Sequence, residues 1–220
     1  MELLEGMKTR RSIRAFKPDP VPGEVVAKIV ETAGNCSSYL STQPWEITVV
    51  SGNKKDEIVN KLYRLAEAHN PINPDIPLPT SWPPELKERS MEHGARRLNT
   101  LGIERDDREG REELRLQNFQ FYGAPCAAFL LMDDSLGEWS LFDMGLFTQN
   151  FVLAAHGYGL GCCIQASVTE YAKEIKRYLG INEKMKMVVC ISFGYPDPEG
   201  KLNLYRSLKK KPEDFFQWFE

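Results

Sequence analysis

Apolar residues recur at two spacings along the 220-residue chain, and the two spacings predict helices interleaved with strands. A spacing of three to four residues predicts helices over residues 23–34, 54–69, 85–101, 107–119, 139–156 and 169–179. β-branched or continuous apolar runs predict strands over residues 47–50, 126–132 and 185–193. The run over 126–132 is apolar throughout, and we expect it and the strand over 185–193 to be buried.

The segment 139–156 is apolar on nearly every face, unlike the other predicted helices. Such a helix must be covered all round, either by the core or by a second chain. The highly charged helices over 85–101 and 107–119 have modest apolar stripes, so they are either surface helices or elements that need a partner subunit. The glycines of 157–161 end the apolar helix, whereas a dinucleotide-binding fingerprint opens one. We therefore interpret them as a cap that permits close backbone approach.

Two further stretches have no periodic pattern. Six prolines between Asn70 and Pro84, here called the proline-rich loop, nearly exclude regular structure, and a loop of this length is typical of a lid or a partner-wrapping arm. The chain ends in an aromatic segment with Phe215, Phe216, Trp218 and Phe219. Large exposed apolar patches are rare on monomers, so we expect the partner chain of a dimer to cover this segment.

The composition limits the classes of function. A chain of this length with 42% hydrophobic residues can bury a substantial core, so we expect a single domain over residues 1–220. The formal net charge of −3 gives no general attraction to nucleic acid or to an anionic membrane, and we expect neither as a partner. We recognise neither a signal peptide nor an apolar run of membrane-spanning length, and we expect a cytoplasmic protein.

The five cysteines and three histidines are not arranged as a reactive site. The cysteines are odd in number, show no CxxC spacing and mostly lie in apolar runs, so we expect buried thiols and no disulfide. No histidine is paired with another histidine or a cysteine at the spacing of metal ligands, so we expect no metal site.

The segment from Thr9 to Phe16, here called the arginine segment, is the first candidate site. It places Arg10, Arg11, Ser12 and Arg14 within five residues. Guanidinium groups present donors that match phosphate oxygens, and a serine hydroxyl can bind a further oxygen, so the group suits a phosphate monoester. The alternative interpretation is a solvated basic N-terminus.

The segment from Asn35 to Trp45, here called the polar loop, is the second candidate site. It is rich in hydroxyl and amide side chains, carries two large aromatic residues and leads into the predicted strand at 47–50. It is either one wall of a ligand site or an ordinary turn before a strand.

Four pieces of sequence, in this order, resemble the FMN-dependent nitroreductase family over essentially the whole chain. They are Arg10-Arg11-Ser12-Ile13-Arg14, Gln43-Pro44-Trp45, the stretch from Leu153-Ala154-Ala155 to Gly159-Leu160-Gly161, and Arg206. The charged helices and the segment from Asn118 to Pro125 look most like the nitrobenzoate-reductase branch of that family. The resemblance implies an α+β fold with a mixed sheet flanked by helices, an intertwined homodimer, and FMN bound at the subunit interface.

The resemblance also assigns contacts to the cofactor. Arg10, Ser12 and Arg206 would hold the FMN phosphate with Arg11 nearby, and Arg14 would lie at the pyrimidine edge of the flavin. The guanidinium group of Arg14 would stabilise the negative charge of the reduced ring and raise its reduction potential.

Two other segments complete the implied site. Ser37, Ser38 and Tyr39 would come from the other subunit, with Gln43 supporting their loop. The residues implied to run beside the ring and offer backbone groups are Cys163, Ile164, Gln165 and Ala166. At positions 37 and 39 the sequence departs from the common family pattern, which has a frequent proline and a small residue there.

The implied reaction is ping-pong reduction of a nitroaromatic or similar electron-poor compound, with NADH or NADPH as hydride donor to flavin N5. It needs no acid–base side chain, so we name no catalytic residue, and we expect Trp82 and Tyr122 to line the substrate pocket. Three alternatives are open: the same scaffold acting on quinones, activated alkenes or halogenated aromatics; a flavin-binding module with little turnover; and a pyridoxal phosphate protein. The last would need a Schiff-base lysine, and no lysine here is distinguished by its context.

Overall fold

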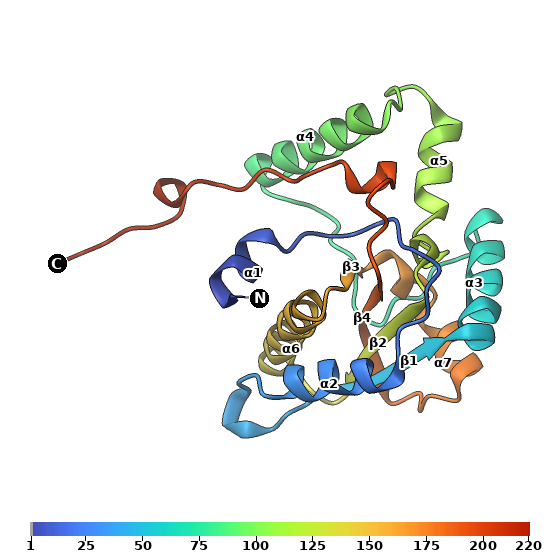
Figure 1. Cartoon of the computed structure of the whole chain (residues 1–220), viewed down its shortest axis with the longest axis vertical. Helices are drawn as coiled ribbons and strands as arrows, with labels where there is room; N and C mark the ends of the chain where they lie inside the picture. The colour runs from blue at the N-terminus through green and yellow to red at the C-terminus, as the bar shows by residue number, and fades with distance from the viewer. Residues whose placement is uncertain (1) are drawn as a thin grey trace.

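The computed structural model describes residues 2–220 and shows one sheet with helices on both faces (Figure 1). The helices are α1 (Leu3–Thr9), α2 (Gly23–Gly34), α3 (Gly52–Glu67), α4 (Pro84–Leu101), α5 (Arg108–Leu116), α6 (Glu138–Gly157) and α7 (Ala172–Leu179). The strands are β1 (Glu46–Ser51), β2 (Cys126–Asp133), β3 (Gly161–Gln165) and β4 (Met185–Gly194). The α+β fold class expected from the sequence is confirmed.

The sheet has the strand order β1-β2-β4-β3, and every ladder in it is antiparallel. Within residues 2–220, the parallel pairing is an isolated bridge between Ser12 and Cys162, so the mixed character of the sheet comes from this bridge alone. β2 and β4 are the central strands, and both are almost wholly buried. β1 and β3 form the two edges of the sheet in the single chain.

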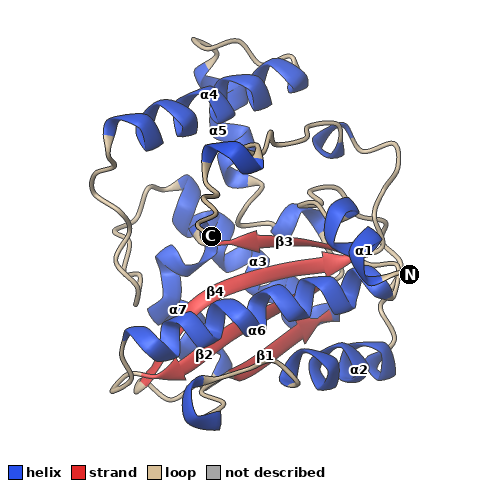
Figure 2. Ribbon diagram, turned by 90° about the vertical axis from the view of Figure 1, so that its left-hand side faces the viewer, coloured by secondary structure: helices blue, strands red, loops and turns tan. Residues whose placement is uncertain are grey.

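The side chains of β2 alternate between two hydrophobic cores, because successive residues of a strand point to opposite faces. Phe129 and Leu131 face the core beneath α3 and α7, whereas Ala128 and Leu130 face the core beneath α2 and α6. Figure 2 shows α6 running along the second face of the sheet. Both faces are therefore covered, as the continuous apolar run of β2 predicts.

Most predicted elements are confirmed, and two were not predicted. α2 has the predicted bounds, and the other predicted helices and strands lie within a few residues of theirs. The helix predicted over 107–119 begins after Asp107, whose side chain accepts the backbone N–H of Gly110 as the N-cap. It ends at Leu116. α1 and β3 were missed because seven and five residues are too few to show a period.

The proline-rich loop contains no helix or strand before α4, as predicted, but its first half is fastened to the body. The backbone N–H of Lys173 on α7 donates to the Asn73 side chain at 3.0 Å. Asp75 forms an ion pair of 2.9 Å with the buried Lys176 and accepts the backbone N–H of Met187 at 2.8 Å. These contacts hold residues 73–75 against α7 and β4, and the interpretation of the loop as a lid or a partner-wrapping arm stays a prediction.

α4 and the C-terminal tail are the least covered parts of the described chain. No residue of α4 is buried in residues 2–220. The tail runs away from the body (Figure 1), and its Trp218 and Phe219 are 72% and 86% exposed. Among the helices of this part, none has the length and apolar character needed to cross a membrane.

Candidate functional site

The arginine segment lies along the outer edge of β3. The backbone N–H of Ile13 donates to the Cys162 carbonyl oxygen at 2.9 Å, and Ile13 is buried. A Cβ atom on Gly161 would lie 2.5 Å from the Ile13 side chain, so this close approach requires glycine there. The expectation that the 157–161 glycines permit close backbone approach is confirmed at Gly161.

Asn203 fastens the arginine segment to the C-terminal segment. Its side-chain oxygen accepts the backbone N–H groups of Arg14 and Ala15 at 2.7 and 3.2 Å, and its amide nitrogen donates to the carbonyl oxygens of Ala15 and Asp197, both at 2.9 Å. Its own carbonyl oxygen accepts Nη1 of Arg11 at 2.6 Å. Sequence reasoning missed Asn203, because nothing in the local sequence except its nearness to Arg206 marks it.

The guanidinium groups of this region have no carboxylate partner. Within residues 2–220, no ion pair is formed by Arg10, Arg11, Arg14 or Arg206. Burial lowers the pKa of Arg11, and the positive charge of Arg206 lowers it further. Arg206 therefore lies close enough to Arg11 to repel it, and a bound anion would offset this repulsion.

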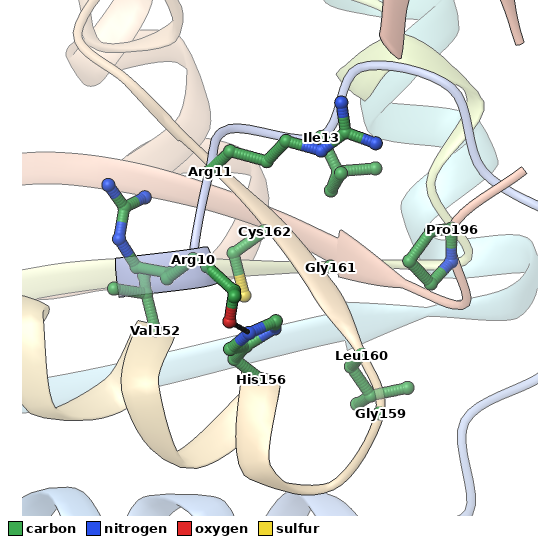
Figure 3. Close-up of a pocket in the computed structure, with 11 residues that line it drawn as sticks. Arg10, Arg11, Ile13, Val152, His156, Gly159, Leu160, Gly161, Cys162 and Pro196 are labelled. Carbon is green, nitrogen blue, oxygen red and sulfur yellow. Dashed lines mark hydrogen bonds between the residues drawn. The ribbon is translucent and has the colours of Figure 1, made fainter. Parts of the chain in front are cut away.

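A cavity of about 230 Å³ lies between the arginine segment and the end of α6 (Figure 3). Arg10 and Arg11 lie on one side of it, and His156 and Leu160 lie on the other. The Nε2 atom of His156 is 2.9 Å from the hydroxyl oxygen of Thr9. Burial and the nearby Arg10 lower the pKa of His156.

Tyr122 is the centre of a second, buried group of polar side chains. Its hydroxyl donates to the Asn118 side chain at 2.7 Å, and the carbonyl oxygen of Asn118 accepts Nε2 of Gln165 at 2.8 Å. The guanidinium carbon of Arg14 is 6.0 Å from the centre of the Tyr122 ring. Burial raises the pKa of Tyr122. Phe121 and Tyr122 have φ angles of 52° and 54°, a strained conformation of the kind found at binding sites.

Two buried polar atoms beside this group lack a partner. Nε of Arg14 and Oε1 of Gln165 form no hydrogen bond within the described chain. An unpartnered buried donor or acceptor costs about 1–3 kcal/mol, so such atoms indicate a polar ligand or ordered water. A heterocycle with both donors and acceptors on its edge, such as a flavin, fits this pair of atoms.

Three of the four residues expected beside the ring lie on β3, and Ala166 follows the strand directly. Cys163 and Gln165 are each 2% exposed, whereas Ile164 is 42% exposed and Ala166 is exposed. Because the Cys162 carbonyl points to the outer edge of the sheet, the backbone groups of Ile164, two residues on, point the same way. Ile164 therefore presents its N–H and C=O at an open sheet edge.

The polar loop lies at the other end of α6. The backbone N–H of Tyr39 donates to both oxygens of Asp143 at 3.1 Å, and the Tyr39 ring stacks on Trp139 with centres 5.7 Å apart. Ser38 accepts the backbone N–H of Gln43 at 3.1 Å, while Ser37 is exposed. Ser37, Ser38, Tyr39 and Gln43 thus lie in one loop, and their role at a cofactor stays a prediction.

The polar loop and the arginine segment are not brought together within one chain. They contact α6 at Asp143 and His156, which are 13 residues apart. At 1.5 Å per residue this separation is about 20 Å along the helix. Within one chain the two segments therefore contact opposite parts of α6.

The two residues predicted to line the substrate pocket differ in burial and in surroundings. Tyr122 is 7% exposed and faces Arg14, whereas Trp82 is 53% exposed in the last part of the proline-rich loop. α4 instead supplies residues to the Tyr122 region that sequence reasoning missed, His93 and Arg97. Helical spacing places them on one face of α4, but only the tertiary structure directs that face to Tyr122.

Within residues 2–220, no group of three or more His, Cys, Asp or Glu side chains is placed to hold a metal ion. All five cysteines are free thiols.

Comparisons with known proteins agree with this arrangement. The model of the Nitroreductase family matches residues 7–195. Nitroreductase NfnB of Mycolicibacterium smegmatis is 35% identical over 198 residues, which cover 90% of this chain and 84% of that protein. The 4-nitrobenzoate reductase of Pseudomonas putida is 30% identical over 207 residues, with coverage of 94% and 91%.

A solved structure extends the similarity to the whole fold. The crystal structure of the FMN-dependent nitroreductase NfnB from Mycobacterium smegmatis in complex with NADPH superposes with a TM-score of 0.94, at 31% identity, over 100% of both chains. The sheet, the arginine segment and these matches define a flavoprotein type of fold. The chain belongs to the nitroreductase family, as the four sequence motifs indicated.

Proposed function

We propose that this protein is an FMN-dependent NAD(P)H oxidoreductase that reduces nitroaromatic or similar electron-poor compounds. The observation that supports this function best is the combination of family membership with a set of guanidinium groups that have no carboxylate partner in residues 2–220. The relatives named above include a nitrobenzoate reductase and an FMN-dependent enzyme solved with NADPH. The whole chain, residues 1–220, forms one FMN-binding domain in this proposal.

The phosphate of FMN binds at the arginine segment. Arg10, Ser12 and Arg206 hold it, and Arg11 adds a charge that is already oriented by Asn203. The repulsion between Arg11 and Arg206 supports this assignment, since a dianionic phosphate between them converts a cost into an attraction.

The ring of FMN lies along β3. Arg14, whose Nε atom is buried and unpartnered, binds the pyrimidine edge, and Cys163, Ile164, Gln165 and Ala166 supply backbone and side-chain groups beside the ring. When bound, FMN would supply the hydride-transfer chemistry between NADH or NADPH and the acceptor. The chain positions the ring, excludes water with Tyr122 and, through Arg14, favours the reduced anion; no side chain acts as an acid or base.

The protein works as a homodimer in this proposal. The polar loop of one copy, with Ser37, Ser38, Tyr39 and Gln43, completes the site formed by the arginine segment of the other. Two observations support it: the loop and the segment lie about 20 Å apart along α6 within one chain, and the exposed aromatic tail needs cover. The five free thiols suit a reducing compartment, so we place the protein in the cytoplasm.

The decisive test is the visible absorption spectrum of the purified protein, recorded before and after anaerobic addition of NADH and then NADPH. A flavin spectrum that bleaches is expected. A colourless protein that takes up no added FMN would contradict the proposal. A flavin that bleaches with neither coenzyme would indicate a binding module instead.

A panel of acceptors then separates the substrate classes. Turnover is expected to be greatest with nitroaromatic compounds, compared with quinones, activated alkenes and halogenated aromatics. Trp82 and Tyr122 are proposed to line this pocket. Faster turnover with any of the other three classes would assign the same scaffold to that chemistry.

A further inference from the structure

One face of α4 carries a row of nitrogen-bearing side chains toward the candidate site. His93, Arg96 and Arg97 lie on that face because residues three and four apart share one side of a helix. Nδ1 of His93 is 2.9 Å from the hydroxyl oxygen of Tyr205, and the two rings meet edge to face with centres 5.2 Å apart. Tyr205 is buried and precedes Arg206, so this bond holds α4 against the segment that carries Arg206.

Arg97 differs from its neighbour Arg96 in its partners. Nη1 of Arg96 lies 3.1 Å from the carboxylate of Glu92, one turn earlier on α4. Arg97 forms no ion pair within the described part of the chain, and its Nη2 atom is buried without a hydrogen-bond partner. Arg96 also has a buried nitrogen without a partner, Nε, but its charge is already paired, whereas the buried Nη2 atom of Arg97 belongs to an unpaired charge and is expected to meet an acceptor in the functional complex.

Arg97 reaches the same buried ring as Arg14, from a different element. Burial raises the pKa of both Tyr122 and Cys163, and the charges of Arg14 and Arg97 act against this rise at each of the two. Arg14 comes from the arginine segment and lies 6.0 Å from the Tyr122 ring centre. Two guanidinium groups therefore converge on the part of the chain where we propose that the flavin and the acceptor meet.

The charges that act on His93 are positive, and three of the four cations, Arg14, Arg97 and Lys209, form no ion pair within the described residues, whereas Arg96 is paired with Glu92. Burial lowers the pKa of His93, and the cations that lower it further are Arg14, Arg97, Arg96 and Lys209. No carboxylate is among the groups that shift the pKa of His93. A concentration of positive charge beside a partly buried ring favours an anionic reactant.

We propose that Arg97 binds the carboxylate of an aromatic acceptor and thereby makes aromatic acids the preferred substrates. This inference rests on the proposed function, in which Arg14 serves the flavin and leaves Arg97 for the second reactant. A guanidinium fork binds a carboxylate through two parallel hydrogen bonds, which fixes the orientation of the acid as well as its affinity. Arg97 is thus a specificity-determining residue, and it takes no part in hydride transfer.

The test is calorimetric titration with benzoate and with benzamide, its neutral counterpart of similar shape. Wild-type protein is expected to bind benzoate more tightly. Arg97→Gln is expected to lose about tenfold in benzoate affinity, the loss typical of one charge-assisted contact, and to change benzamide binding less than about twofold. Arg97→Lys should recover part of the loss. Arg89→Gln, which removes a charge from an exposed position of the same helix, should behave as wild type.

Equal affinities of the wild-type protein for the two compounds would overturn the inference, and so would a parallel loss of both in Arg97→Gln. Because neither compound is reduced, the titration gives its answer even if the protein shows no turnover, which would defeat the proposed function alone. A parallel measurement of KM for NADPH and NADH covers the other anionic reactant. If Arg97→Gln raises KM for NADPH but not for NADH, and leaves benzoate binding unchanged, Arg97 would be reassigned to the 2′-phosphate of the coenzyme.

Discussion

The side-chain oxygen of Asn203 accepts the backbone N–H of Arg14 at 2.7 Å, across 189 residues of sequence. The same side chain is 5% exposed and bonds to Ala15 and Asp197 as well. A single buried amide therefore holds the arginine segment in register with the segment that ends in Arg206. Asn203 thus positions both parts of the proposed phosphate site, the arginine segment and the segment with Arg206.

Replacement of Asn203 by alanine should destabilise the fold and weaken the site together. Four hydrogen bonds of the side chain are lost, each with a net value of about 0.5–1.5 kcal/mol, so we expect a loss of about 2–6 kcal/mol in the free energy of unfolding. Urea unfolding with a flavin-retention assay measures both effects. Asn99→Ala, at an exposed position of α4, is the control. Unchanged flavin retention in a destabilised Asn203→Ala would show that the fastening does not serve the cofactor.

Arg206→Ala should weaken FMN binding by about 1.5–3 kcal/mol, the range for a hydrogen bond to a charged group. The expected reason is the loss of one phosphate contact, while the relief of repulsion on Arg11 favours the flavin-free protein. Equilibrium dialysis of FMN gives the dissociation constant, with the exposed Lys210→Ala as the charge-matched control. An unchanged constant would mean that a different arginine holds the phosphate.

Gly161→Ala should disturb the arginine segment without touching its charges. The added methyl group would lie 2.5 Å from the Ile13 side chain, a contact that costs about 1–3 kcal/mol and pushes the segment off β3. We expect a lower melting temperature and weaker FMN retention. Gly34→Ala, where an added Cβ meets nothing within 4 Å, should leave both unchanged. Normal FMN retention in Gly161→Ala would show that cofactor binding does not depend on the position of the arginine segment on β3.

Mixing two variants with different defects, at an FMN concentration too low to load either one alone, tests whether the site is shared between copies. Asp143→Ala removes the acceptor of the Tyr39 backbone N–H and should disable the polar loop, whereas Arg206→Ala disables the phosphate end. In a mixed dimer, one site receives the intact parts of both chains. Co-expression in equal amounts should restore about a quarter of wild-type activity, since half of the dimers are mixed and each has one intact site.

The control for that experiment is the mixture of each variant with itself, which should stay inactive. Sedimentation at micromolar concentration should report a dimer. Absence of complementation in a dimeric mixture would place the loop and the arginine segment in sites of a single chain.

The stability of the flavin-free protein should fall as the pH falls below the ordinary histidine pKa of about 6.5. The pKa values of His93 and His156 are lowered in the folded state, first by burial and then by nearby arginines, so the unfolded chain binds more protons. The stability from the two neutral rings is thus present above pH 6.5 and is lost as the pH falls through the folded pKa values.

Urea unfolding at several pH values between 7.5 and 5 measures this dependence. The double variant His93→Gln, His156→Gln should show a flatter profile, and the exposed His69→Gln is the control. A double variant with the full pH dependence of the wild type would assign the effect to other groups.

The sequence by itself determined the elements that have a long enough pattern and the chemistry that is local. α2 and β2 follow from the spacing of apolar residues, since burial on one face of a helix or on both faces of a strand leaves a period in the sequence. The arginine segment was recognisable for a similar reason. Its donors are close together in the chain, and their match to a phosphate needs no distant residue.

Only the tertiary structure decided how these parts meet. β3 is too short to show a period, and the fastening by Asn203 joins residues 189 positions apart, so neither has a local signal. The separation of Asp143 and His156 along α6 places the polar loop and the arginine segment about 20 Å apart within one chain, which the sequence does not show. The face of α4 that carries Arg97 is directed by its packing on Tyr205, because charged helices have no core-facing stripe strong enough to orient them in advance.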